Sequence, residues 1–414
     1  MMRKYPRVIH CLFGKSINLP NATALSRFYS LKANEFAILG IESSCDDTAA
    51  AVVTSTGRIL SNVIRNQHKV HAKYGGIVPI LAAEQHTMNM PYVISEALEQ
   101  ANLAVPDLAA IAVTRGPGMP GSLGVCLNAA KTLAAVFKKP LIGVHHMEAH
   151  ALVARINTDN NIQFPFLSFL LSGGHTMLLV AHSVNRYSCL GTTLDDSIGE
   201  VFDKVSRQID IPSIKDQLDS YSFYSKSQYQ NHSAGEALEL LASFGDERKY
   251  SLPLPMNKSD TSSSLNYSFS GLKSAAFRLI SSISESESES ESDLAKLFKS
   301  KADVAASFQY TATKHLISKL VKSLFYTRSQ LGIFPKSIVV SGGVASNKYI
   351  NGKLREFAHS NKMEYFSPPI HLCTDNGVMI AWAGVERFKL GLTDPYSITF
   401  KQRWPLEELG SPLA

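Results

Sequence analysis

The sequence predicts an α/β protein made of two similar lobes. Predicted strands alternate with predicted helices along the chain, and a pair of short apolar runs joined by a polar turn occurs twice. Each pair opens a new stretch of alternating elements, which indicates a duplicated architecture rather than one continuous sheet. With 414 residues, 45% hydrophobic and 18% charged, the chain is long enough for two packed cores. We expect the lobes at 35–144 and 145–405.

Both lobes are predicted to begin with a pair of strands. In the first lobe they are the paired strands Ala37–Ile41 and Ala49–Thr54, a helix over about 81–103, a strand at Leu108–Thr114, a helix ending near Phe137 and a strand at Leu141–Val144. In the second they are the paired strands Phe166–Leu171 and Met177–Ala181, a strand at Ser337–Val340 and an apolar helix at Val378–Arg387. At 284–292 five Ser alternate with four Glu, and we expect a solvated linker there.

The N-terminal segment differs in charge from the rest of the chain. Residues 1–34 hold six basic and no acidic side chains, whereas the remaining chain holds 35 of each sign. An acid-free basic segment of this kind is typical of a mitochondrial transit peptide, so we expect cleavage near Tyr29 or Ser30 and a location in the mitochondrial matrix. The alternative is a disordered basic tail on a cytosolic protein.

Other features of the composition exclude several classes of protein. The longest apolar run, Phe164–Leu171, is the size of a strand, and a membrane span needs roughly 18 residues. We therefore predict no membrane span. The five cysteines occur without a CxxC pair, which argues against a disulfide framework and against a zinc ribbon.

Three loops of small residues lie at or near predicted strand ends: Glu42–Thr48, Leu171–Thr176 and Val340–Asn347. Glycine pairs in the last two loops let main-chain N–H groups approach a phosphate closely, and a helix that starts after Gly343 would add its positive dipole end. A single loop of this kind also occurs in ordinary turns. Three of them favour the nucleotide cleft of the actin/Hsp70/sugar-kinase superfold.

A candidate metal site lies in the segment that runs from Val144 to His150. On a helix, His146 and His150 lie one turn apart on the same face. A zincin protease needs HExxH, whereas Glu148 stands at the second position and faces away. Asp375 lies in a turn before an apolar helix and is a possible third ligand, which would give a site suited to iron or zinc. The alternative is a pair of structural, hydrogen-bonded histidines.

These motifs resemble those of the universal tRNA threonylcarbamoyladenosine transferase family. The resemblance covers about 37–395 and rests on ordered blocks that include Ile41–Thr48, Gly116-Pro117-Gly118, His145–His150, Leu171–Thr176, Phe269–Lys273, Ser341–Asn347 and Cys373–Gly377. Together with the transit peptide, it points to the mitochondrial branch of the family. It implies two actin-like lobes with a helical insertion.

The resemblance also implies an activity. The family transfers the threonylcarbamoyl group of threonylcarbamoyl-AMP to the adenosine 3′ of the anticodon, in tRNAs that read codons starting with A. One divalent metal ion, iron or zinc, would bind His146, His150 and Asp375. The residues implied to contact substrate are Leu170, Leu171, Ser172, Gly173, Gly174, Asp203, Gly235, Glu239, Ser346, Asn347 and Thr374. Around 233–239 the chain departs from the family's usual Gly-Gly-Pro pattern.

The expected partners are mitochondrial tRNA, threonylcarbamoyl-AMP and a second copy of the chain in a homodimer. Basic residues dominate 294–330, where an apolar stripe of Leu316, Leu320 and Leu324 would bury the opposite helix face. We therefore expect tRNA to bind Lys314, Lys319 and Lys322. A smaller basic patch is Arg65, Lys69 and Lys73, and the alternative for both is an ordinary solvated surface.

Two other functions remain open from the residues themselves. One is a sugar or acyl kinase of the same superfold, although such kinases carry Asp in the first hairpin where this chain has Glu42. The other is a non-enzymatic nucleotide-binding scaffold, which would not need the histidine pair. No general base is evident, and we interpret Cys45 as a small apolar residue rather than a nucleophile.

Overall fold

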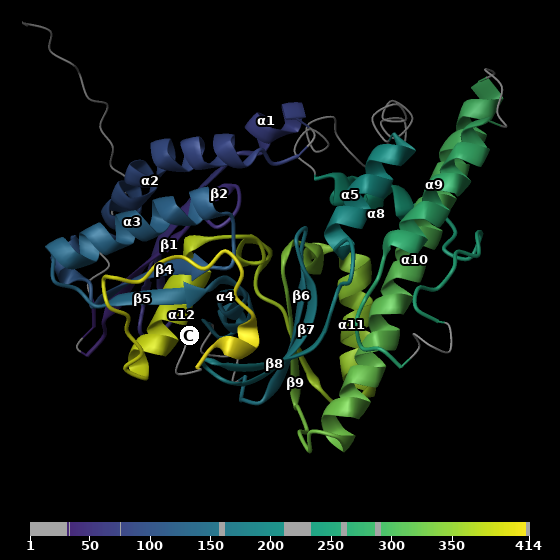
Figure 1. Ribbon diagram of the computed structural model, residues 1–414. Helices are drawn as coiled ribbons and strands as arrows, with labels where there is room; N and C mark the ends of the chain where they lie inside the picture. Colours follow the sequence, from purple (N-terminus) through teal and green to yellow (C-terminus); the bar gives the residue numbers. More distant parts are fainter. Residues whose placement is uncertain are drawn as a thin grey trace, which may run out of the picture.

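The computed structural model describes residues 31–32, 34–74, 76–156, 162–210, 233–257, 263–285 and 291–410, which form two α/β lobes side by side (Figure 1). Nearly all of the predicted transit peptide lies outside these residues. The first sheet contains β1 (Ala37–Glu42), β2 (Asp47–Thr54), β3 (Ile59–Asn66), β4 (Ala110–Gly116) and β5 (Leu141–His145). The second contains β6 (Phe166–Leu171), β7 (Thr176–Ser183), β8 (Arg186–Thr192), β9 (Ser337–Ser341) and β10 (Glu364–Phe366).

The two sheets have the same topology. The strand order is β3-β2-β1-β4-β5 in the first and β8-β7-β6-β9-β10 in the second. In each sheet the first three strands form an antiparallel meander, and the last two run parallel to the first strand. The predicted α/β fold with duplicated lobes is confirmed.

Helices cover both faces of the first sheet. Helices α2 (Pro79–Ala101) and α3 (Pro120–Val136) lie on one face, and α12 (Gly377–Lys389) lies on the other. Side chains of a strand alternate between its two faces, so Leu39 and Ile41 join the cluster of α2 and α3 while Ile38 joins that of α12.

The position of α12 differs from the expected lobe boundaries. The helix follows the second lobe in the sequence, yet it packs against β1, β2 and β4 of the first sheet. Glycines permit this close approach, because a Cβ added to Gly40 would lie only 2.3 Å from the main-chain nitrogen of Ala381. The range 145–405 therefore contains a helix of the first lobe.

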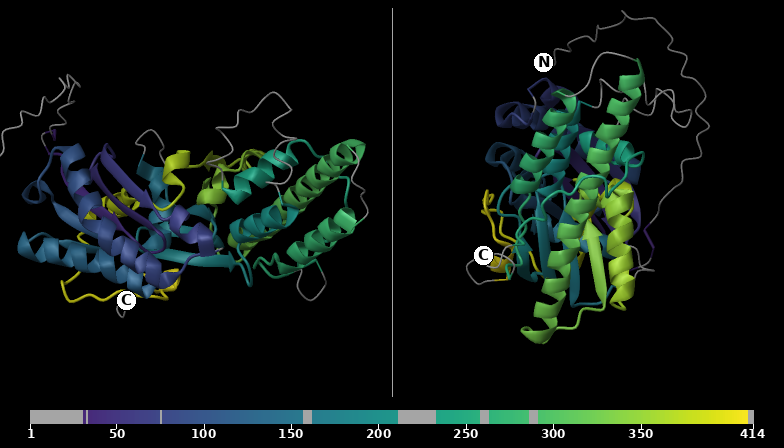
Figure 2. Two further views of the ribbon diagram at one scale, coloured as in Figure 1. Left: turned by 90° about the horizontal axis from the view of Figure 1, so that it is seen from above. Right: turned by 90° about the vertical axis from the view of Figure 1, so that its right-hand side faces the viewer.

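The second lobe carries the expected helical insertion between β8 and β9. In the described part of the chain the insertion contains α5 (Ile198–Ile209), α8 (Ala234–Ala242), α9 (Ser270–Glu285) and α10 (Glu291–Ser329), and α11 (Lys348–Ser360) follows β9. Figures 1 and 2 show α9 and α10 at the outer side of this lobe. Part of the predicted Ser/Glu linker is helical, since 284–285 end α9 and 291–292 begin α10, and 286–290 lie outside the described residues. None of the helices that the structure describes is long and apolar enough to cross a membrane.

The basic surface predicted on α10 is only partly present. Leu316, Leu320 and Leu324 are buried as expected, and Lys314 is exposed. Lys319, however, is 1% exposed, and its Nζ donates a hydrogen bond to the carbonyl oxygen of Ser264 at 2.6 Å. It lies three residues after Leu316 and therefore shares the buried face. The prediction that Lys319 binds tRNA is wrong.

Candidate metal and nucleotide site

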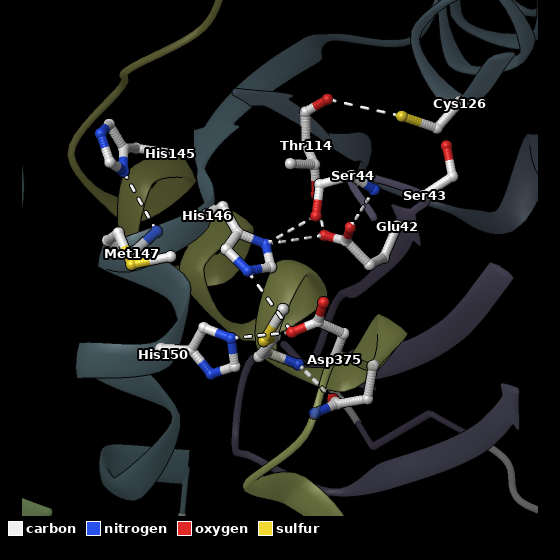
Figure 3. A network of polar contacts seen from close by, with 12 residues as sticks. Glu42, Ser43, Ser44, Thr114, Cys126, His145, His146, Met147, His150 and Asp375 are labelled. Atoms are coloured by element: carbon white, nitrogen blue, oxygen red, sulfur yellow. Dashed lines mark hydrogen bonds and ion pairs between the residues drawn. The ribbon is translucent and has the colours of Figure 1, made fainter. Parts of the chain in front are cut away.

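Three potential metal ligands from distant parts of the chain meet at the ends of β5 and α12. Helix α4 (His146–Leu152) begins directly after β5, so His146 and His150 lie one turn apart on it. Asp375 immediately precedes Asn376, the N-cap residue of α12. One potential ligand atom from each of the three residues lies within 4.8 Å of the other two. Figure 3 shows the three side chains pointing toward one another.

The carboxylate of Asp375 contacts both imidazoles. Its Oδ1 lies 3.0 Å from His150 Nε2 and 3.4 Å from His146 Nε2. Both histidines are buried. Two imidazole nitrogens and one carboxylate oxygen suit zinc or iron and leave coordination positions for other ligands. The residues therefore fit the predicted metal site, although this donor set does not distinguish the two metals.

The charges of the cluster favour a protonated His146 when no metal is bound. Burial disfavours the imidazolium form, but the carboxylates of Asp375 and Glu42 outweigh it and raise the pKa of His146 to about 10. Against the opposing effect of burial, His146 holds the pKa of Asp375 well below its usual range. A divalent ion must displace this proton, so metal binding is expected to release protons.

Glu42, at the end of β1, contacts Nδ1 of His146, the ring nitrogen that does not face Asp375. Its Oε2 lies 3.3 Å from His146 Nδ1, and the hydroxyl of Ser44 lies 3.2 Å from the same nitrogen (Figure 3). Glu42 is fully buried and accepts hydrogen bonds from Thr114 Oγ1 and from the main-chain N–H of Ser44. A carboxylate behind a metal-binding histidine fixes the orientation of the ring and strengthens its donor nitrogen. The sequence offered a signal for this role, because a charged residue that ends a buried strand needs a partner.

The turn between β6 and β7 exposes its glycines. A Cβ added to Gly173 or Gly174 would meet nothing within 4 Å. The turn is closed by its own groups, since the main-chain N–H of Ser172 donates to the carbonyl of His175 at 2.8 Å. The side chains of Leu170 and Leu171, by contrast, are buried in the core. These two predicted contacts can reach a ligand only through the main chain.

The loop after β9 lies against the same turn. Gly342 has a φ of +96°, and a Cβ there would lie 2.3 Å from the carbonyl oxygen of Leu171. The expected helix start after Gly343 is a short 3-10 turn (η5, Gly343–Ser346), and the regular helix α11 begins at Lys348. The structure places Thr374 beside this loop, 3.8 Å from a Cβ built on Gly343.

Two predicted substrate contacts of the loop are engaged in local structure. Asn347 caps α11 by accepting the N–H of Ile350 at 2.9 Å, and its amide donates to Gln309 Oε1 at 3.0 Å. The Ser346 hydroxyl donates to the carbonyl of Gly343 at 2.6 Å. These contacts hold the loop in its local conformation and engage both side chains within the protein.

The remaining predicted contacts lie on α5 and α8, which pack against each other. A Cβ on Gly235 would lie 3.5 Å from Asp203 Oδ1. Glu239 accepts the main-chain N–H of Lys348 at 2.7 Å, so it reaches the start of α11. Burial raises the pKa values of both carboxyl groups. The structure thus brings Asp203 to Gly235 and Glu239 to the loop after β9.

Two glycine-rich turns and a His/His/Asp cluster on a duplicated α/β fold are compatible with a class of protein that binds a metal ion and a nucleotide. Comparison with known proteins specifies this class. Residues 58–382 match the family model described as TsaD, tRNA N6-adenosine threonylcarbamoyltransferase. The chain belongs to this family, and it is a transferase.

Curated relatives align with nearly the whole chain. A protein of Arabidopsis thaliana called probable tRNA N6-adenosine threonylcarbamoyltransferase, mitochondrial, is 40% identical over 90% of this chain and 75% of its own length. The tRNA N6-adenosine threonylcarbamoyltransferase of Rickettsia bellii is 39% identical over 90% of this chain and 99% of its own. That of Bartonella tribocorum is 38% identical over 91% and 97%.

Proposed function

We propose that this chain transfers the threonylcarbamoyl group of threonylcarbamoyl-AMP to the N6 amine of the adenosine 3′ of the anticodon, in mitochondrial tRNAs that read codons starting with A. Family membership supports the reaction class. The observation in this protein that most supports the proposal is the convergence of His146, His150 and Asp375, with Glu42 behind His146. Because Glu42 is buried and bonded, it is not an open magnesium carboxylate of the kind a kinase needs.

The reaction needs positioning more than a strong nucleophile, because the donor is an activated mixed anhydride. The N6 nitrogen attacks the carbamoyl carbon, the bond from that carbon to the phosphate oxygen breaks, AMP leaves with the electron pair, and N6 loses a proton. In this proposal the main chain of Leu170–Gly174, with Ser346, Asn347 and Thr374, holds the nucleotide part of the donor, and Asp203, Gly235 and Glu239 lie around it. A divalent ion on His146, His150 and Asp375 would supply Lewis-acid orientation of the acyl group.

A transfer assay tests this proposal directly. Purified protein, threonylcarbamoyl-AMP and unmodified mitochondrial tRNA should yield threonylcarbamoyladenosine at the position 3′ of the anticodon, measured by nucleoside mass spectrometry. A tRNA that reads codons starting with another base is the control. Phosphate release from ATP with sugars or acyl acceptors, without any modified nucleoside, would instead support the kinase alternative.

The proposal includes a mitochondrial matrix protein that acts as a homodimer. A mitochondrial relative supports the location, and N-terminal sequencing of the endogenous protein that found Met1 intact would contradict it. Helix α2 supports self-association, since the apolar residues Ile80, Met88 and Tyr92 are 60–73% exposed and lie on one face of the helix. Light scattering should give twice the monomer mass, and a fully active monomer would rule out the dimer.

A further inference from the structure

A network of buried polar side chains lies beside the candidate metal cluster but is not part of it. It consists of Gln67, after β3; His71, at the end of α1 (His68–His71); and His86, on α2. All three are less than 5% exposed, and the Thr48 hydroxyl that joins them is fully buried. Burying this many polar groups is costly unless each has a partner, so the arrangement calls for an explanation.

The hydrogen bonds of this network all run in the same direction, from donor to acceptor. The main-chain N–H of Val78 donates to His71 Nδ1 at 3.3 Å, so the proton of His71 is on Nε2 and is donated to Gln67 Oε1 at 2.9 Å. The Gln67 amide then donates to His86 Nδ1 at 3.3 Å. His86 Nε2 finally donates to the carbonyl oxygen of Cys45 at 2.9 Å. Both ends are main-chain groups that cannot exchange roles, which fixes the direction of the hydrogen bonds between them.

The Cys45 carbonyl belongs to the turn between β1 and β2, next to the metal cluster. It also accepts a bond from Ser122 Oγ at 3.3 Å, and the neighbouring Ser44 carbonyl accepts the N–H of Met119 at 2.9 Å. Ser44 in turn places its hydroxyl 3.2 Å from His146 Nδ1. A shift of the Cys45 carbonyl would therefore move a group that contacts a metal ligand.

We propose that Gln67, His71 and His86 are positioning residues that hold the Cys45 carbonyl, and with it the turn beside His146, in the geometry that transfer requires. His86 is the decisive member, because its Nδ1 accepts from Gln67 and Thr48 while its Nε2 donates to the turn. The part of this inference that concerns turnover rests on the proposed transferase function. The part that concerns the turn does not.

Two amide variants distinguish the hydrogen bond made by Nε2 of His86 from those made by its Nδ1. In His86→Gln the amide nitrogen replaces Nε2 and can still donate to Cys45, whereas in His86→Asn the amide oxygen replaces Nδ1 and the bond to Cys45 is lost. A misplacement of about 1 Å at a site can cost roughly a hundredfold in rate, so kcat of His86→Asn should fall about tenfold or more. Its KM for threonylcarbamoyl-AMP should change less than about threefold, and His86→Gln should keep most of its turnover.

A second readout does not depend on activity. Cys45 and Cys189 are both partly buried and lie in different lobes, so the alkylation rate of Cys45 relative to Cys189 reports the state of the turn. We expect this ratio to rise several-fold in His86→Asn and to stay near the original value in His86→Gln. His315→Gln, which removes a buried histidine from α10, is the matched control and should leave the ratio unchanged.

Equal effects of the Asn and Gln variants on both readouts would overturn the proposal, since a merely structural role makes no distinction between the two ends. If His86→Asn does not fold, Gln67→Met removes the amide at similar volume and should raise the Cys45 ratio in the same direction; an unchanged ratio there also overturns it. An inactive original protein with the expected alkylation pattern would reject the proposed function but retain the positioning role.

Discussion

The two lobes share one topology but use their first turns in opposite ways. In the first lobe the β1–β2 turn and the strand ends that flank it bury polar side chains: Glu42, Ser44 and Thr48 are at most 3% exposed, and each contacts a histidine. In the second lobe the β6–β7 turn exposes Gly173 and Gly174 with open space where a side chain would stand. The first turn therefore offers side chains to a ligand, whereas the second offers its main chain.

This difference shows how a duplicated fold can supply two halves of one site. A metal ion needs convergent side chains that are held by further hydrogen bonds, which requires burial. A phosphate or acyl-phosphate needs main-chain N–H groups that a ligand can approach, which requires exposure and no Cβ. The same hairpin position meets either need, depending on whether the turn carries polar side chains or glycine.

The largest expected effect comes from removing the two imidazoles of α4, the helix that directly follows β5 of the first lobe. The double variant His146→Ala, His150→Ala should reduce bound metal from about one ion per chain to about a tenth or less, because ligand loss exceeds the 10–100-fold effect of residues behind the ligands. Metal analysis after dialysis measures this. His182→Ala, which removes a histidine of β7 in the other lobe, should leave the metal content unchanged. Full metal content in the double variant would exclude the cluster as the site.

The next effect distinguishes glycines that serve the fold from glycines that serve the ligand. Gly342→Ala places a Cβ at φ +96° against the Leu171 carbonyl and should destabilise the protein by about 1–3 kcal/mol from backbone conformation alone. Gly173→Ala meets no steric obstacle and should leave thermal stability unchanged. It should still weaken threonylcarbamoyl-AMP binding by about tenfold, because the added methyl group shields the main chain. Calorimetry and ligand titration measure the two quantities, and a destabilised but tightly binding Gly173→Ala would reverse the assignment.

The sequence was sufficient to predict the parts of this comparison that depend on local pattern. Apolar runs located the two hairpins, and the one-turn spacing of His146 and His150 followed from helical periodicity. Packing across the chain was not predictable in the same way. Nothing local shows that α12 returns to the first sheet, or that Lys319 lies on the buried side of α10 rather than on its surface.

The roles of Glu42 and His86 show the same limit at the site itself. Both are polar residues in or next to apolar segments, which signals a buried partner but does not identify it. Their partners, His146 and the Cys45 carbonyl, lie 104 and 41 residues away in the sequence. Only the assembled fold shows that Glu42 contacts a candidate metal ligand and that His86 contacts the adjoining turn.

The smallest expected effect concerns one buried histidine in each lobe whose pKa is lowered, His145 in the first and His315 in the second. In the first lobe, burial lowers the pKa of His145 to about 3, and both its nitrogens are bonded, to the Trp404 carbonyl at 2.9 Å and the Met147 N–H at 3.1 Å. In the second, burial lowers the pKa of His315 to about 4, with a further contribution from Lys319. Between pH 6.5, the ordinary histidine value, and pH 4, the unfolded chain therefore binds a proton at each position that the folded chain does not.

Because the unfolded state takes up more protons in this window, the free energy of unfolding should decrease as the pH falls, by up to about 1.4 kcal/mol per pH unit for each histidine. His315→Gln should lower stability at pH 7 by removing a packed ring, yet flatten this dependence by up to that amount between pH 6 and 4.5. Denaturant titrations of the original protein and the variant at several pH values measure how steeply the free energy of unfolding depends on pH in each. Titratable groups that both proteins share contribute equally, so the difference between the two slopes reports His315. An unchanged slope would mean that His315 is protonated in the folded protein, and that the two lobes treat their buried histidines differently.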